Sequence, residues 1–195
     1  MRSDVLNPPN PRAYTFVGGD EGSMRVLSQR TVSGASIAPV SRVDMLASLL
    51  TELPSAAAWM LSGVATNDRY TTRTEKGELT SRQAPIGRPE ATRAALILLR
   101  KRPEWWALAQ DERRTILEED SHHIAIGIRY LPAVARRLLH CRDLATHTPF
   151  DFLGFLDFAP GDETAFDDML VQLRATREWS FMDREVDVRL TRIDG

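Results

Sequence analysis

The order of the expected elements most constrains the fold, because both halves of the chain show the order strand, strand, helix, strand. In the first half, β-branched and aromatic residues at 13–18 and 24–32 predict two strands joined by the turn Gly-Gly-Asp-Glu-Gly. Apolar residues at helical spacing over 41–53, followed by a proline, predict a helix. A further apolar run, 57–64, is expected to complete this half as a strand.

The second half is expected to repeat this order. The segments 133–141 and 150–158 predict strands, and 163–174 predicts an amphipathic helix. Apolar and charged residues alternate over 185–190, as in a strand with one buried face. The repeat predicts an α+β fold of two ferredoxin-like modules that share a sheet or barrel, with the N-terminal module shortened.

A helical insert is predicted between the two halves. Pro89 favours the start of a helix over the apolar run that ends at 99, before Pro103, and Asp111 can cap a second helix that reaches Tyr130. The domain boundaries that follow are a flexible N-terminus at 1–12, an N-terminal half at 13–88, and the insert with the C-terminal half at 89–195.

The composition excludes several classes of function. Of the 195 residues, 43% are hydrophobic and 27% charged, which suffices for a core of ordinary size. A formal net charge of −2 provides no basic field for nucleic acid. The one cysteine, Cys141, excludes an internal disulfide framework, and no apolar run predicts a membrane span or a signal peptide. We therefore expect a cytoplasmic protein that binds neither nucleic acid nor membranes.

His123 and Arg136 are the most direct candidates for a functional site. His123 lies at the edge of the apolar face of the predicted helix, and Arg136 lies among apolar residues of the strand that follows. Such a pair can place an imidazole below a haem iron and a guanidinium above it, which suits oxyanion chemistry. Plainer interpretations are a hydrogen-bonded core histidine and an arginine in a structural salt bridge.

Two polar residues could complete such a site. An axial histidine needs an acceptor for its second ring nitrogen, and Glu178 is the candidate. A solvated carboxylate at the start of the last strand is the alternative interpretation. Gln83 could orient Arg136 from a loop, or it could be an ordinary surface glutamine.

The segments around these residues resemble the chlorite dismutase family, and in particular its short, dimeric branch. The likeness covers about residues 16–192. The segments that carry it, in the family's order and spacing, are 68–73, 87–93, 100–106 (Arg-Lys-Arg-Pro-Glu-Trp-Trp), the helix around His123, 136–140, 151–153 and 174–178.

The resemblance implies a role for each candidate residue. His123 would be the proximal ligand of the haem iron, with Glu178 as its hydrogen-bond partner. Arg136 would be the flexible distal arginine, which Gln83 restrains. The remaining positions that the resemblance places at the haem are Lys101 and Tyr70, on its propionates, and Trp105, beside it.

The resemblance also implies a dimeric α+β barrel fold, a homodimer with one haem b per subunit, and a chlorite dismutase activity. Chlorite would be converted to chloride and dioxygen by oxygen-atom transfer and rebound at ferric haem. The alternatives are a coprohaem decarboxylase of haem biosynthesis, whose distal position usually holds glutamine, and a haem carrier or sensor without turnover. Gly154 and Leu156 replace a threonine and a distal phenylalanine common in the family, which predicts a roomier distal pocket.

Overall fold

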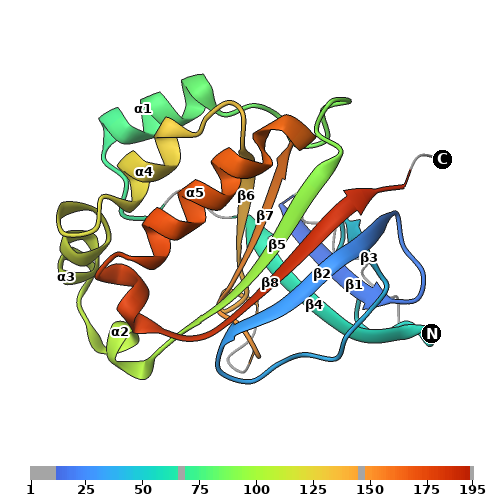
Figure 1. The fold of residues 1–195 in the computed structure, drawn as a ribbon. Helices are drawn as coiled ribbons and strands as arrows, with labels where there is room; N and C mark the ends of the chain where they lie inside the picture. Colours follow the sequence, from blue (N-terminus) through green and yellow to red (C-terminus); the bar gives the residue numbers. More distant parts are fainter. Residues whose placement is uncertain (1–11, 66–68, 145–147, 194–195) are drawn as a thin grey trace, which may run out of the picture.

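Eight strands form a closed antiparallel barrel, and the helices lie together against one side of it, in the computed structural model of residues 12–65, 69–144 and 148–193 (Figure 1). The strands are β1 Ala13–Gly19, β2 Met24–Ser33, β3 Arg42–Leu46, β4 Ala57–Ala65, β5 Arg93–Lys101, β6 Ala135–His140, β7 Phe152–Phe158 and β8 Met182–Arg192. The helices are α1 Arg73–Arg82, α2 Pro103–Ala107, α3 Gln110–Arg114, α4 His123–Arg129 and α5 Glu163–Arg174.

The two halves of the chain contribute to one barrel. Its strands follow the order β1-β3-β2-β8-β5-β7-β6-β4, and two seams join the halves, β2 with β8 and β4 with β6. This confirms the predicted α+β class and the shared barrel. The strands expected in 13–32, 57–64, 133–158 and 185–190 are all present.

Two apolar cores lie on opposite faces of the C-terminal strands. Alternate residues of β5, Leu96 and Leu98, belong to the core that also holds Phe16 of β1, inside the barrel. The residues between them, including Ile97, pack with α5, whose buried stripe includes Phe166. The amphipathic helix predicted at 163–174 is therefore confirmed, and it covers the outer face of the sheet.

The prediction of a helix from Pro89 to 99 is wrong, because Arg93–Lys101 forms β5. A strand buried on both faces shows a continuous apolar run rather than alternation, and such a run cannot be distinguished from a buried helix by its period. The helical part of the insert begins at Pro103, the first residue of α2.

The helix predicted over 41–53 is also wrong. Arg42–Leu46 forms β3, which pairs with β1 and β2 in the barrel. The expected apolar stripe is not buried as a unit, since Val43 is fully buried whereas Leu49 and Leu53 are exposed. Pairing of Val43 within the sheet determines the structure of this segment.

The helix expected from Asp111 to Tyr130 is interrupted. A π-helical turn, Thr115–Glu119, follows α3, and His122 has a left-handed backbone with a φ of 53°. A new helix, α4, then begins at His123. Its first backbone N–H groups are satisfied by the buried carboxylate of Glu118, which accepts hydrogen bonds from the backbone of Ile124 and Ala125.

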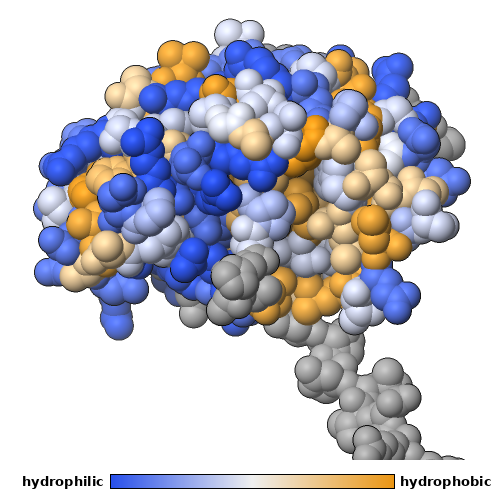
Figure 2. Space-filling model, turned by 90° about the horizontal axis from the view of Figure 1, so that it is seen from below, coloured by the Kyte–Doolittle hydropathy of each residue, from blue (hydrophilic) through white to orange (hydrophobic). Residues whose placement is uncertain are grey.

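The surface of the protein carries both polar and apolar patches (Figure 2). Viewed from below, polar residues gather toward the helical side and apolar ones toward the barrel side (Figure 2). A hollow of about 470 Å³ on the barrel is lined by Ile37, Trp59 and Leu61 among others.

No helix in the described part of the chain has the length and apolar character needed to cross a membrane. The flexible N-terminus predicted at 1–12 lies, except for Arg12, outside the described residues.

Candidate active site

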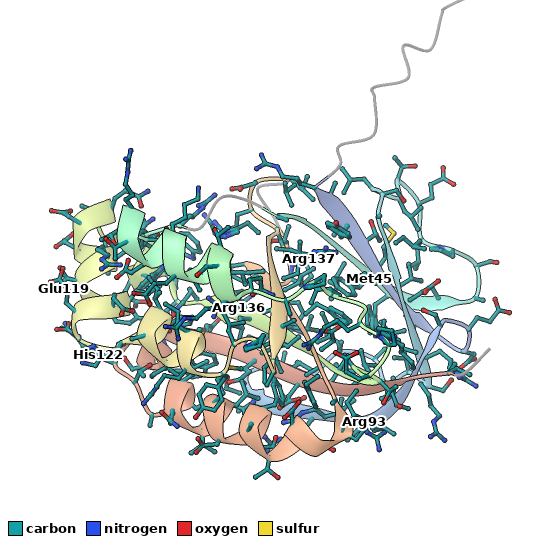
Figure 3. All side chains as sticks on the ribbon, turned by 90° about the horizontal axis from the view of Figure 1, so that it is seen from above. Met45, Arg93, Glu119, His122, Arg136 and Arg137 are labelled. Carbon is teal, nitrogen blue, oxygen red and sulfur yellow. The ribbon has the colours of Figure 1, made fainter. Side chains whose placement is uncertain are left out.

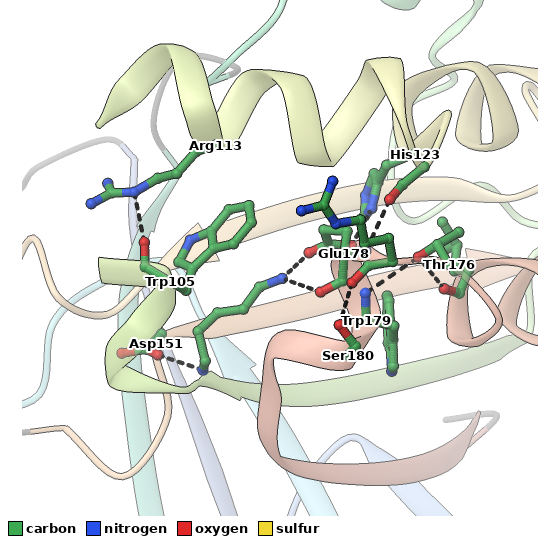
Figure 4. A network of polar contacts seen from close by, with 12 residues as sticks. Trp105, Arg113, His123, Asp151, Thr176, Glu178, Trp179 and Ser180 are labelled. Atoms are coloured by element: carbon green, nitrogen blue, oxygen red, sulfur yellow. Dashed lines mark hydrogen bonds and ion pairs between the residues drawn. The ribbon is translucent and has the colours of Figure 1, made fainter. Parts of the chain in front are cut away.

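The site begins with a histidine whose ring is fixed by a buried carboxylate. His123 is the first residue of α4, and its Nδ1 lies 3.0 Å from Oε2 of Glu178 (Figure 4). Glu178 belongs to a 3₁₀ turn, Glu178–Phe181, just before β8. Because Nδ1 is engaged by the carboxylate, Nε2 is the nitrogen that can coordinate a metal. The pairing of His123 with Glu178 is the one that the sequence predicted.

Glu178 is an ionised carboxylate within the protein. Its side chain is 3% exposed, and it forms a salt bridge with Lys101, which is equally buried. Burial alone would raise the pKa of Glu178, but the charge of Lys101 and then that of His123 outweigh burial and lower the pKa to about 2. Its backbone N–H donates to Ser121 Oγ at 2.8 Å. The alternative of a solvated carboxylate on the last strand is therefore wrong.

Arg136 points from β6 toward the helix that carries His123. Figure 3 shows Arg136 on the helical side of β6, whereas Arg137 is directed to the barrel and stacks over Tyr14 of β1 at 4.2 Å. The guanidinium of Arg136 lies against Gly127 of α4, and an added Cβ at Gly127 would be 3.2 Å from its Cζ. Gly127 is one turn after His123 on the same side of α4. The structure therefore brings the two leading candidates to facing sides of α4 and β6.

The sheet next to Arg136 presents an apolar surface that is partly open. Leu156 of β7 is directly opposite Arg136, and Gly154 is opposite Leu138, so the four residues share one face. Leu138 is 47% exposed although it faces the helical layer. A Cβ at Gly154 would make only ordinary contacts, at 3.6 Å or more. Gly154 and Leu156, the two residues expected to widen the pocket, thus lie on the neighbouring strand beside Arg136.

A second group of predicted residues surrounds a buried indole. Trp105 of α2 is 1% exposed, with Lys101 Nζ 4.2 Å above its ring and Tyr70 packed edge-on at 6.3 Å between ring centroids. Arg113 donates to the backbone oxygen of Trp105 (Figure 4). The indole N–H of Trp105 is buried and has no hydrogen-bond acceptor among the described residues. A buried donor without a partner is costly, so this N–H is available to an acceptor that the described residues do not supply.

Gln83 is placed near the site, but its side chain is engaged locally. It is the C-terminal cap of α1, and its amide donates to the carbonyl of Ala84 at 2.8 Å. The helix that carries it packs on α4 through Leu79, which clusters with Ile124 and Ile128. The restraint of Arg136 by Gln83 stays a prediction.

Two features of the site were not predicted from the sequence. The first is the contact of Gly127 with Arg136, for which a glycine inside a helix, four residues after a candidate ligand, is the available signal. The second is the salt bridge between Lys101 and Glu178. Those residues are 77 positions apart, and no local pattern indicates their pairing.

His140 lies on β6, the strand that carries Arg136, but it is a structural residue. It is 6% exposed and packs edge-on against Phe152, with ring centroids 5.0 Å apart. Burial, and then the positive charge of Arg69, lower the pKa of His140 from 6.5 to about 4. Its burial and its packing on Phe152 fit a structural role.

This shift predicts a loss of stability in acid. Between pH 6.5 and 4 the unfolded chain binds a proton at His140 that the folded chain does not, so the free energy of unfolding falls as the pH is lowered through that window. The expected contribution is about 3 kcal/mol. Urea unfolding across this range measures it, with His140→Leu as the comparison. Parallel pH profiles of the parent and the variant would contradict the assignment.

The chain is similar in structure to several known proteins. No family model matches the sequence, and no curated protein sequence matches it. The fold is similar to that of a dimeric chlorite dismutase from Nitrobacter winogradskyi, with a TM-score of 0.83 and 49% sequence identity over 92% of this chain and 99% of that one.

More distant similarity is found to chlorite dismutase from Candidatus Nitrospira defluvii. Its complex with imidazole gives a TM-score of 0.55 at 24% identity, covering 70% of this chain and 56% of that one. A mutant in complex with cyanide gives 0.66 at 18% identity, covering 97% and 93%. At these identities the likeness shows the fold alone.

Together the fold and the site define an α+β barrel in which a histidine–glutamate pair on the helical layer faces an arginine on the sheet. The 49% identity over nearly the whole chain then identifies the family. The chain belongs to the chlorite dismutase family, as the resemblance of its segments predicted.

Proposed function

We propose that the protein is a haem b chlorite dismutase, which converts chlorite to chloride and dioxygen. The observation that carries the proposal is the placement of Arg136 beside Gly127, on the side of α4 where His123 begins the same helix. The similarity to the dimeric chlorite dismutase of Nitrobacter winogradskyi supports the reaction.

Three properties of the residues fit a haem. The His123 ring has one nitrogen held by a carboxylate, as an axial ligand requires. The indole N–H of Trp105 lacks an acceptor in the described part of the chain, and a propionate would supply one. Leu138 exposes apolar surface that the macrocycle would cover. Tyr70 borders the same indole, and we assign it to a propionate. The propionate role that the resemblance gives to Lys101 is not proposed, because its buried ammonium is paired with Glu178.

When bound, haem b would supply the iron at which an oxygen atom is transferred from chlorite. His123 would hold the iron, and Glu178, whose pKa of about 2 keeps it ionised, would hold the Nδ1 proton and increase the basicity of the ring. Arg136 would attract the chlorite anion and retain the hypochlorite fragment, because its guanidinium stays charged at any working pH. Gln83 is assigned to restrain that side chain.

The same proposal covers the organisation of the protein. The neighbouring strands are β4-β1-β3-β2 in the first half and β8-β5-β7-β6 in the second, so each half has the order 4-1-3-2 when its strands are counted along the chain. This order supports two ferredoxin-like modules with the boundary near residue 88. The N-terminal module has no helix between β1 and β2 or between β3 and β4 in the residues that the structure describes, which agrees with a shortened module. A homodimer is proposed from the dimeric neighbour, and residence in the cytoplasm from the sequence.

An oxygen electrode tests the activity. Haem-loaded protein is expected to release one dioxygen for each chlorite consumed, and a failure to release dioxygen would overturn the proposal.

The variant Arg136→Ala is expected to keep part of the turnover but to release hypochlorite to a chemical trap and to inactivate sooner, because the fragment is no longer retained. Arg137→Ala, at the next position but facing the barrel, is the matched control. Equal trapping in the parent and in Arg136→Ala would show that Arg136 does not retain the fragment.

A further inference from the structure

Gly127 occupies a helical position that favours a larger residue. It is buried within α4, and its backbone is not in the left-handed region that requires glycine. A glycine inside a helix costs about 1 kcal/mol relative to alanine. The reason for glycine at this position must therefore be found in what surrounds its Cα.

The missing side chain of Gly127 points into the gap between α4 and β6. An added Cβ would collide with Nη1 of Arg136 and lie 3.2 Å from Cζ and 3.5 Å from Nη2. In contrast, Gly77 in α1 has nothing within 4 Å of an added Cβ. Residues four apart lie on the same side of a helix, so the direction that Gly127 leaves open is also the side of His123.

We propose that Gly127 is the residue that leaves room for the haem between α4 and Arg136. The inference rests on the proposed function, because it requires that His123 hold the cofactor. Gly127 is a positioning residue in this scheme. Its role would be to keep side-chain atoms off the part of the helix surface that the porphyrin would cover.

Two effects of a side chain at this position would have opposite signs. If Gly127 served only to seat the guanidinium of Arg136, a methyl group would displace that guanidinium without meeting the haem, and haem affinity would stay equal or rise. If Gly127 provides clearance for the haem, the same methyl group would meet the ring and affinity would fall. The direction of the change in affinity therefore separates the two roles.

The experiment is a titration of cofactor-free protein with haemin, followed through the Soret band. Gly127→Ala is expected to bind about tenfold more weakly than the parent, and Gly127→Leu more weakly still, because an overpacked contact costs on this order. Gly77→Ala and Gly77→Leu make the same changes in an exposed helix and are expected to bind like the parent. Thermal unfolding of the cofactor-free proteins checks folding, and Gly127→Ala keeps the test available if Gly127→Leu does not fold.

A double variant completes the design. Gly127→Ala combined with Arg136→Ala removes the guanidinium that the methyl group would displace, and it is expected to bind haemin as weakly as Gly127→Ala alone. Recovery of the parent affinity would overturn the proposal, as would equal affinity of Gly127→Ala and the parent. If the parent itself bound no haemin, the proposed function would fail and the inference with it.

Discussion

Replacement of His123 with alanine is expected to abolish stable haem binding. Glu178 holds Nδ1 of His123 at the start of α4, which leaves Nε2 of the same ring to bind the iron. In titrations with haemin, the parent is expected to show a shifted, intense Soret band and His123→Ala only the spectrum of loosely associated haemin. An unchanged Soret band in the variant would contradict the assignment of His123 as the axial ligand.

The neighbouring histidine provides the control for this substitution. His122 is exposed and has a left-handed backbone, which asparagine also tolerates, so His122→Asn is expected to bind haemin like the parent. His123→Ala should still fold, because His123 is 28% exposed and Glu178 keeps Lys101 as a partner, so the loss of the hydrogen bond costs about 1–3 kcal/mol. Circular dichroism of both variants before loading distinguishes loss of the ligand from loss of the fold.

Replacement of Glu178 with glutamine is expected to destabilise the protein by about 3–5 kcal/mol, because it removes the carboxylate that pairs directly with the buried ammonium of Lys101. Both side chains of the pair are 3% exposed, so water cannot take over this role without local unfolding. Urea unfolding of the cofactor-free protein measures the loss. A change below about 1 kcal/mol would show that the pair is not as buried as the structure indicates.

A double variant separates the two functions of Glu178. Combining Glu178→Gln with Lys101→Met removes the unpaired charge and is expected to restore most of the stability. It does not restore the anionic acceptor of His123. Haem bound to the double variant should therefore have a more positive reduction potential than haem in the parent, since the ring donates less electron density to the iron. An unchanged potential would mean that Glu178 acts only as the partner of Lys101.

The sequence predicted those elements whose pattern is set by one buried face. The alternation in β8 and the stripe of α5 against Phe158 and Ile97 are of this kind. β5 was mistaken for a helix because both of its faces are buried, and residues 42–46 because the barrel requires a strand between β1 and β2. In such segments tertiary pairing, which a local window does not contain, decides between helix and strand.

The site shows the same division. The pairing of His123 with Glu178 spans 55 positions, and it was predicted through the resemblance rather than through spacing. The sequence could not predict that α4 starts at His123 itself, since this depends on the left-handed His122 and on the carboxylate of Glu118. The contact of Arg136 with Gly127 likewise arises only once β6 has docked beside the helix.

The position of β8 couples closure of the barrel to formation of the site. β8 is the last described strand in chain order, yet it lies between β2 and β5, with Met24 paired to Arg192. During synthesis on the ribosome, a nascent chain that ends before the Glu178–Phe181 turn lacks both β8 and Glu178, so it can neither close the barrel nor fix the His123 ring. Closure of the barrel and orientation of the histidine ring are thus acquired together, through one continuous segment of the chain.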